Sequence, residues 1–327
     1  MVRVRGTNVS IVAGIDEAGY GPPLGPLIVS GVVFYVPDEH RQADLWKLLT
    51  RYVSPNPRVK RKLVVADSKD AYTPSKGVGV IEETSLCFLA LTGGRHERMG
   101  TLLRALAGEE AEDALNYPWY QDQDAEIPLS GRALGVDRKT ERLTRALEMS
   151  GVRFLGVRCV PLFEAAFNRS LKETKNKQSV LFGQAAKLIS GLMNRYAAED
   201  LLITIDKHGS RDRYAPLLGR RFKGARLTVR HQDRQVGHYR IRHRGRQSEV
   251  RFLLNGEKHS MPVALASMFS KYVRELYMRM FNGFWRKHLP QVRSTAGYAR
   301  DARRFLADIA PVRRKLGIPD EVLVRQR

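Results

Sequence analysis

Acidic residues stand at the ends of apolar segments in three separate parts of the chain. Asp16 ends the run "NVSIVAGID" and Glu17 follows it, Asp206 ends "LLITID", and Glu257 stands just before a helix start in "NGEKHSMPVALAS". Acids in such positions could converge at one edge of a sheet, where divalent cations with oxygen ligands would relieve their mutual repulsion. Two Mg²⁺ or Mn²⁺ ions about 3.5–4 Å apart would activate a water and stabilise the leaving oxygen during attack on a phosphodiester.

Other interpretations of these polar residues stay open at the level of sequence. An Asp-Glu pair after a strand is commonly part of a turn or a helix cap. Asp233 is an alternative fourth ligand, but no helix start follows it, so it ranks below Glu257. His208, Lys258 and His259 lie beside the proposed acids and could shuttle protons, or they could be exposed polar residues in loops.

The segments that carry the acids alternate between strand and helix patterns. Short runs rich in Val, Ile and Leu predict strands at 8–16, 27–36, 152–160 and 201–206. Helical periodicity covers 176–196, 262–285 and 301–317, with a helix start at Ser260 and Pro262. Interleaved strands and helices predict an α/β fold. The segment 93–135 is polar, acidic and rich in turns, so we expect a surface insertion there.

The chain is strongly basic. It has 56 Lys and Arg against 34 Asp and Glu, and 43% hydrophobic residues, which indicates a folded basic protein rather than a disordered one. This charge favours a polyanionic partner, with nucleic acid ahead of an anionic membrane; a basic surface that only aids solubility is the alternative. The segment 207–251 holds 14 Lys and Arg against three acids. In its period-two pattern, Arg240, Arg242 and Arg244 would share one face of a β-ribbon, which either binds phosphate or is the solvated side of a hairpin.

Cysteine content and hydropathy exclude several classes of protein. The two cysteines, Cys87 and Cys159, lie in apolar runs and are too few for a disulfide framework or a zinc site. The N-terminal segment lacks the apolar stretch of a secretory signal, and the longest uncharged run, 18–37, is broken by glycines and prolines. We therefore expect a cytoplasmic protein with no membrane partner.

Five segments resemble those of a known family. "GIDEAGYGPPLGPLIVSGVVF" resembles the opening motif of ribonucleases HII, and "VADSKDAYTP" is similar to their Asp-Ser-Lys segment. "NGEKHSMPVALASMFSKYVRE" resembles the segment that supplies their fourth carboxylate and their Ala-Ser-x-x-x-Lys helix. "TAGYARDARRFL" and "VLVRQR" resemble their Gly-Tyr element and closing Arg motif. The similarity spans Gly14 to Arg325, with insertions at about 93–135 and 210–250.

The resemblance implies a fold, a site and its ions. The fold is a ribonuclease H-like mixed β-sheet flanked by helices, in a catalytic domain at 1–289 that contains the Arg-rich ribbon, with a C-terminal helical segment at 290–327 packed on it. Asp16, Glu17, Asp206 and Glu257 would be catalytic and would hold two Mg²⁺ or Mn²⁺ ions, Glu257 standing where the family usually has Asp. Further positions would bind substrate, namely Gly19, Tyr20, Gly21, Ser68, Lys69, Asn168 and Tyr298.

Roles in substrate binding follow from the same resemblance. Ser68 and Lys69 would contact a backbone phosphate, and Tyr298 would stack beside an RNA–DNA junction. Tyr20 stands where the family has Arg in a Gly-Arg-Gly turn, and Ala296 where bacterial members have Lys, so two positive charges near the substrate are lost. The glycines on either side of Tyr20 remain, and their backbone amides could approach a 2′-hydroxyl.

Together these features predict a metal-dependent endoribonuclease that is a monomer. It would cleave the RNA strand of RNA–DNA hybrids, or the phosphodiester beside ribonucleotides embedded in DNA, by two-metal hydrolysis. The resemblance implies that the products carry 5′-phosphate and 3′-hydroxyl ends. Two alternatives stay open. One is a hybrid- or duplex-binding protein of the same fold that has lost its chemistry through Tyr20 and Glu257, and the other is a related nuclease that acts on structured DNA.

Overall fold

A mixed sheet forms the centre of the protein. In the part of the chain that the computed structural model describes, residues 9–59, 61–75, 77–121, 124–196, 200–243 and 245–326, this sheet has seven strands in the order β5-β2-β1-β6-β9-β8-β7. The strands are β1 Val9–Ala18, β2 Leu27–Pro37, β5 Arg153–Leu162, β6 Asp200–Asp206, β7 Arg226–Gln232, β8 Val236–His243 and β9 Arg246–Leu253. A small parallel pair, β3 Val53–Ser54 and β4 Leu63–Val64, lies apart from it.

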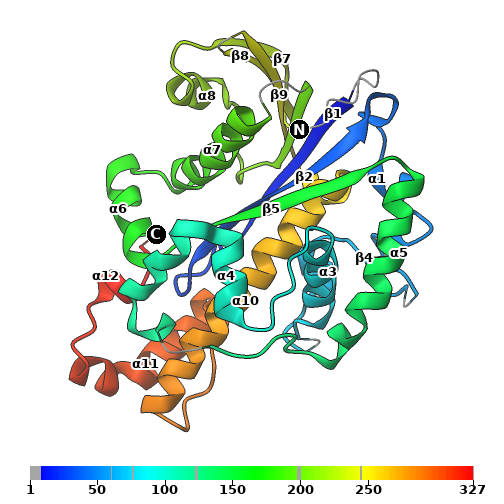
Figure 1. Cartoon of the computed structure of the whole chain (residues 1–327). Helices are drawn as coiled ribbons and strands as arrows, with labels where there is room; N and C mark the ends of the chain where they lie inside the picture. The colour runs from blue at the N-terminus through cyan, green and yellow to red at the C-terminus, as the bar shows by residue number, and fades with distance from the viewer. Residues whose placement is uncertain are drawn as a thin grey trace.

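Helices cover both faces of this sheet (Figure 1). They are α1 Leu45–Leu48, α2 Ser68–Ala71, α3 Gly79–Ala90, α4 Met99–Ala107, α5 Val136–Met149, α6 Glu164–Thr174, α7 Lys177–Arg195, α8 Ala215–Arg221, α9 Gly256–His259, α10 Met261–His288, α11 Ala299–Lys315 and α12 Asp320–Leu323. Short 3₁₀ turns are η1 Asp38–His40, η2 Gly108–Asn116, η3 Pro118–Tyr120 and η4 Gly131–Gly135. The predicted α/β fold with a mixed sheet flanked by helices is confirmed.

Strand direction explains how distant acids come to one edge of the sheet. Strand β1 runs antiparallel to β2 and parallel to β6, and β6 is parallel to β9. The β1–β6 register ends with Ile15 opposite Ile205, which places Asp16 and Asp206 at the next position of two neighbouring strands. Strand β1 extends to Ala18, two residues beyond the predicted end at 16, so Glu17 as well as Asp16 lies within the strand.

The period-two alternation of β1 divides the core between the two faces of the sheet. Val12 belongs to the hydrophobic cluster that contains α10 and α3, whereas Ile11, Ala13 and Ile15 belong to the cluster that contains α7. Both faces are therefore covered, which is why β1 is apolar at nearly every position. Asp16 and Glu17 interrupt this apolar pattern at the end of the strand, where both residues line a cavity.

Gly14 permits a close approach between β1 and the start of α10. A Cβ atom at this position would lie 2.1 Å from the carbonyl carbon of Pro262, so no larger residue fits without moving the backbone. Pro262 stands in the first turn of α10, where its fixed φ suits a helix start. This contact brings α9, which carries Glu257, against the acidic end of β1.

The segment 93–135 differs from the predicted surface insertion. Its residues Tyr117, Trp119 and Tyr120 are at most 5% exposed and belong to the main core cluster. The ring of Trp119 packs edge-on against Phe281 of α10 at a centroid distance of 5.6 Å. Met99, Leu102, Leu103, Leu106 and Ile127 of the same segment are also buried in this cluster, so apolar residues scattered among polar ones anchor the segment in the core.

The Arg-rich ribbon extends the central sheet and is partly neutralised. Strand β9 is parallel to β6, and β8 and β7 add to it as antiparallel strands. Arg240 and Arg242 share a face of β8 as predicted, because the alternating residues Tyr239 and Ile241 are buried on the other face. Arg244 lies outside the described residues. Arg240 forms an ion pair of 3.0 Å with Glu249 on the neighbouring strand.

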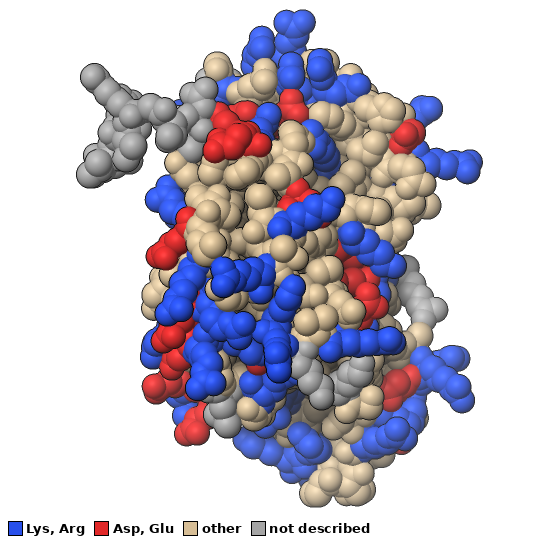
Figure 2. Space-filling model, turned by 90° about the vertical axis from the view of Figure 1, so that its right-hand side faces the viewer, with Lys and Arg blue, Asp and Glu red and all other residues tan. Residues whose placement is uncertain are grey.

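Basic side chains are spread well beyond the ribbon. Figure 2, which views the side where α1 and α5 lie in Figure 1, shows Lys and Arg gathered over much of the lower half of that face, with fewer acids among them. Among the described residues, no helix is long and apolar enough to cross a membrane. Cys87 and Cys159 are buried free thiols, as their apolar sequence context indicated.

Candidate active site

Four carboxylates from three elements line one cavity of about 450 Å³. Asp16 and Glu17 come from the end of β1, Asp206 is the last residue of β6, and Glu257 comes from α9. The side chains of Asp16 and Glu257 are buried, at 6% and 5% exposed. Residues 240 positions apart in the sequence thus share one concave site.

Backbone hydrogen bonds hold two of these carboxylates in place. Asp206 Oδ1 accepts a hydrogen bond of 2.7 Å from the amide of Gly256, which ties the end of β6 to the start of α9. Asn255 adopts the left-handed conformation, with φ of 52°, to turn the chain from β9 into that helix. Asp16 Oδ1 accepts from the amide of Glu17 at 2.7 Å.

Burial and mutual repulsion shift the protonation of the cavity acids. Burial, followed by the charge of Asp206, raises the pKa of Glu17 from 4.5 to about 8. Burial, followed by Asp16 and Glu257, raises the pKa of Asp206 from 3.8 to about 8. The pKa of Asp16 also lies well above its usual range, because of burial and then of Glu17. A cation in this cavity would stabilise the ionised forms.

The donor chemistry of the cavity fits a divalent cation that prefers oxygen. Glu257 Oε2 is buried and has no hydrogen-bond partner, so no donor in the described residues offsets the loss of solvation of this carboxylate oxygen. Carboxylates are the protein ligands that Mg²⁺ and Mn²⁺ favour. In the described residues, however, no group of three or more His, Cys, Asp and Glu side chains is close enough to form a metal-binding set.

Lys69 and Ser68 stand at the cavity on α2. Lys69 Nζ lies 3.7 Å from Glu257 Oε1 while most of its side chain remains exposed. Burial alone would lower the pKa of Lys69, but the surrounding carboxylates, Asp67 first, raise it above its ordinary value. Ser68 is buried, and its hydroxyl is hydrogen-bonded to Ser267 of α10 at 2.9 Å. Lys69 therefore places a largely exposed ammonium group at the cavity, beside Glu257.

The glycine-flanked turn and Tyr298 form another wall of the cavity. Gly19, Tyr20, Gly21 and Tyr298 all line it. Tyr298 is 53% exposed, so its ring is open to an incoming ligand. The ring of Tyr20 is partly buried and lies 4.9 Å from Lys177 Nζ of α7, which places a positive charge beside this side chain.

Asn168 and His208 occupy positions other than those the sequence suggested. Asn168 does not line the cavity; its Nδ2 donates to the carbonyls of Glu321 and Val324 at 2.9 and 2.8 Å, and its Oδ1 accepts from the amide of Gln326. The side-chain amide of Asn168 thus forms its hydrogen bonds with the C-terminal segment. His208 is neither in an exposed loop nor at the cavity, since it is 1% exposed and burial lowers the pKa of its imidazole to about 3.

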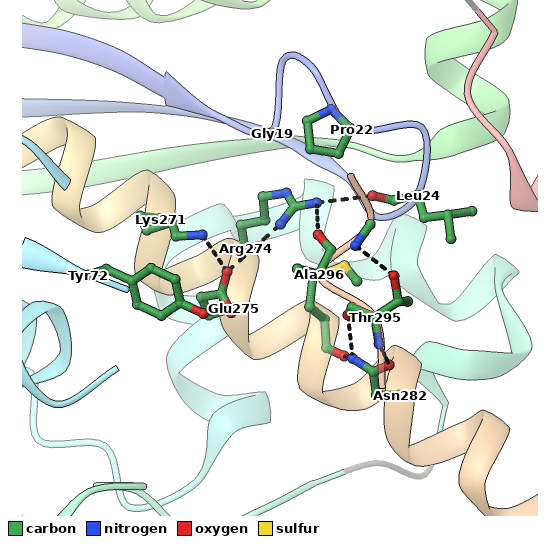
Figure 3. Close-up of polar contacts among 12 residues, drawn as sticks. Gly19, Pro22, Leu24, Tyr72, Lys271, Arg274, Glu275, Asn282, Thr295 and Ala296 are labelled. Atoms are coloured by element: carbon green, nitrogen blue, oxygen red, sulfur yellow. Dashed lines mark hydrogen bonds and ion pairs between the residues drawn. The ribbon is translucent and has the colours of Figure 1, made fainter. Parts of the chain in front are cut away.

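Polar residues of α10 complete the site, among them the Ser and the Lys of the Ala-Ser-x-x-x-Lys segment. Ser267 and Lys271 line the cavity with Tyr72. Lys271 Nζ lies 2.6 Å from one oxygen of Glu275, and Tyr72 Oη donates to the other at 2.9 Å (Figure 3). The signal for them is helical spacing, because polar residues recur every three or four positions on an otherwise apolar helix.

Two buried arginines donate hydrogen bonds to backbone carbonyls of the turn at 19–25. Arg274 Nη2 donates to the carbonyls of Leu24 and Ala296, at 3.0 and 3.2 Å, and so joins this turn to the segment that precedes Tyr298 (Figure 3). Gly19 has a φ of +86°, and a Cβ there would lie 2.5 Å from Arg274 Nε. The turn thus needs glycine both for its conformation and for this contact.

Arg325, near the end of the chain, is the second of these arginines. Its guanidinium donates to the carbonyls of Gly19 and Pro22, and its backbone amide donates to the carbonyl of Pro23 at 2.8 Å. It is 3% exposed, and burial followed by the charge of Arg274 lowers its pKa to about 9, which leaves it charged near neutral pH. Carbonyls of the turn are thereby fixed by residues far away in the sequence.

No protein-family model matches the chain, and no curated protein does. Two similar solved structures are the complex of PCNA with ribonuclease HII from Archaeoglobus fulgidus and the ribonuclease H2 from Pyrococcus horikoshii. The first is 16% identical, with a TM-score of 0.42 over 97% of this chain and 94% of that one. The second is 15% identical, with a TM-score of 0.47 over 96% and 92%.

These solved structures are ribonucleases of the type that the sequence motifs resemble.

Proposed function

We propose that this protein is a metal-dependent endonuclease that cleaves RNA in RNA–DNA hybrids, or the phosphodiester beside ribonucleotides embedded in DNA. One observation carries the proposal: Asp16, Glu17, Asp206 and Glu257, from three elements, line a single cavity. A net charge of +22 supports a nucleic-acid substrate over a small neutral one.

Each group at the cavity has a distinct task in this proposal. The four carboxylates would hold two Mg²⁺ or Mn²⁺ ions, which when bound supply an activated water and charge stabilisation for phosphodiester hydrolysis. Lys69 would hold a phosphate oxygen, since its ammonium is exposed at the cavity mouth. Tyr298 offers an exposed ring for stacking on a base or sugar. Backbone amides at Gly19 and Gly21 would face the 2′-hydroxyl that distinguishes RNA from DNA.

Parallel cleavage assays test this function. The protein is incubated with a DNA duplex that contains one ribonucleotide, with an RNA–DNA hybrid and with plain duplex DNA, each with Mg²⁺, with Mn²⁺ and with EDTA. We expect cleavage of the two RNA-containing substrates only, dependent on the divalent ion, with 5′-phosphate and 3′-hydroxyl products. Cleavage of plain DNA at a similar rate would instead identify a structure-specific DNA nuclease.

A non-catalytic binding protein is the second candidate. It is favoured by Glu257, whose side chain is one methylene longer than that of Asp. It is also favoured because no three or more His, Cys, Asp and Glu side chains among the described residues form a group that could bind a metal ion. The same substrates, measured by fluorescence anisotropy in EDTA, separate the two possibilities. Tight binding of the RNA-containing duplexes with no cleavage under either ion would establish the binding protein.

Replacement of Tyr20 by Arg should increase the preference for a single embedded ribonucleotide. A phenol offers one donor, whereas Arg offers a permanent charge and a planar fork of donors for a phosphate near the junction. We expect the ratio of kcat/KM between the single-ribonucleotide duplex and the continuous hybrid to rise by on the order of 10-fold, which corresponds to about 1.4 kcal/mol.

The control for this substitution is Tyr20→Phe, which keeps the ring beside Lys177 but removes the hydroxyl. It should leave the ratio close to that of the wild type. If Tyr20→Arg also leaves the ratio unmoved, the side chain at this position does not read the substrate, and the glycine amides and Tyr298 must do so.

A further inference from the structure

A second, larger groove opens beside the carboxylate cavity. It has a volume of about 1160 Å³, and Tyr72, Pro74 and Ala296 line both spaces. Figure 3 draws part of this lining, with Tyr72 beside Glu275 and with Ala296 next to Thr295, which is hydrogen-bonded to Asn282. Because the two spaces share residues, a chain that leaves the cavity on this side enters the groove.

Arginines dominate the charge of this groove. Arg279 and Arg286 of α10, Arg293 of the loop after it and Arg132 of the segment 93–135 all line it. Arg279, Arg286 and Arg293 are exposed, and no described residue forms an ion pair or hydrogen bond with their side chains. We call these four residues the arginine groove. Only Arg132 is compensated, by Glu83 at 3.2 Å.

The acids of the groove lining are mostly occupied elsewhere. Glu275 contacts Lys271 and Tyr72, and Asp301 accepts from Thr295 and forms an ion pair of 2.7 Å with Arg304. In the described lining, Asp70 is the acid without an ion pair. Three guanidinium groups without an ion-pair partner among the described residues therefore give the groove a positive electrostatic potential, which attracts an anionic ligand.

The spacing of the arginines suits a ligand with repeated anionic groups. Arg279 and Arg286 stand two helical turns apart on one face of α10, on the order of 10 Å along its axis. Gly77, Val78 and Gly79, which also line the groove, lead into α3, whose start has no side-chain cap. The free amides at this helix start add to the attraction for phosphate that the arginines already create.

We propose that the arginine groove binds the sugar-phosphate backbone of the nucleic-acid strand on one side of the cleaved bond. This inference rests on the proposed function, which places the bond itself at the carboxylates. It also gives the segment 93–135 a role: through Arg132, that segment supplies one wall of the substrate path.

Binding measurements with one-sided probes test the inference. The probes are a short duplex with one central ribonucleotide and two longer versions, extended only on the 5′ or only on the 3′ side of it, measured by anisotropy in EDTA over a series of salt concentrations. The variant carries Arg279→Gln, Arg286→Gln and Arg293→Gln. A matched control carries Arg145→Gln, Arg220→Gln and Arg221→Gln, three exposed arginines outside the groove.

The groove variant should lose affinity for one extended probe far more than for the other. For that probe, the slope of log affinity against log salt should fall by about 2 to 3, since each lost phosphate contact removes about 0.9. The control should not show this one-sided loss. Equal losses in the two triple variants, or an unchanged slope, would overturn the inference.

The outcome for the groove is independent of catalysis. The measurement is made without metal, so a protein that cleaves nothing in the assays above would refute the proposed nuclease while the probes still decide where the strand lies. Conversely, normal cleavage by a groove variant whose one-sided affinity is unchanged would refute the groove alone. All substituted residues are exposed, and thermal unfolding of each variant confirms that it is folded.

Discussion

Asp16→Asn should reduce cleavage of RNA-containing duplexes by more than about 100-fold and leave duplex binding in EDTA as tight as, or tighter than, that of the wild type. Loss of a residue that only supports a metal ligand commonly costs 10–100-fold, and a ligand itself should cost more. Binding should survive because the change removes a negative charge near the substrate phosphate. Cleavage rates and anisotropy on one substrate measure both effects.

The same substitution should change how stability depends on pH when no metal is present. The pKa values of Glu17 and Asp206 are about 8 in the folded protein, against 4.5 and 3.8 for the ordinary side chains. The folded protein thus holds protons that the unfolded chain releases, and stability falls as the pH rises from about 4 to about 8. Asp16→Asn removes one repelling carboxylate, so the Tm in EDTA should fall less over this range.

Asp200→Asn is the matched control for both measurements. Asp200 begins β6, the strand that Asp206 ends, and its exposed carboxylate pairs with Arg41 at 2.8 Å, away from the cavity. This variant should cleave and titrate like the wild type. Cleavage by Asp16→Asn near the wild-type rate would show that the reactive site lies elsewhere, and an unchanged Tm profile would show that Asp16 does not interact with the other acids.

Arg325→Gln should lower kcat/KM by at least 10-fold and reduce discrimination between ribonucleotide and deoxyribonucleotide at the cleaved position. The change leaves the buried carbonyls of Gly19 and Pro22 without their donor, at a cost of about 1–3 kcal/mol for each unsatisfied group. The turn at 19–25 would then sample several conformations, and its amides would no longer be aligned. Steady-state kinetics on matched substrates with and without the ribonucleotide measure the effect.

Arg313→Gln is the control for Arg325→Gln. Arg313 lies in the same C-terminal region, pairs with Asp320 and donates to the carbonyl of Ile318 at 2.8 Å, but it does not touch the turn. It removes the same charge and should retain discrimination. If Arg325→Gln does not fold, Arg325→Lys provides the test, because Lys keeps the charge but lacks the fork that spans two carbonyls. A folded Arg325 variant with wild-type discrimination would show that this arginine does not position the turn.

Much of the candidate site was predictable from local sequence. Asp16, Glu17 and Asp206 are charged residues at the ends of apolar strands, a pattern that burial makes costly unless a ligand compensates for it. The strands, the long helix and the start of that helix at Pro262 follow from periodicity and from the fixed φ of proline, both of which act within a few residues. The period of two in β8 likewise placed Arg240 and Arg242 on a common face.

Tertiary structure alone decided which distant groups meet. Asn168 matched a substrate-binding position in sequence, yet it holds the C-terminal segment, because the position of α6 against α12 determines what its amide reaches. Trp119 lies in a polar segment but belongs to the core. Arg274 and Arg325 support a turn 250 and more residues away, and the partner atoms are backbone carbonyls, which carry no signature in the sequence. Side-chain type and spacing thus determined the chemistry available to this chain, whereas packing of the helices against the sheet determined which of those groups face the same space.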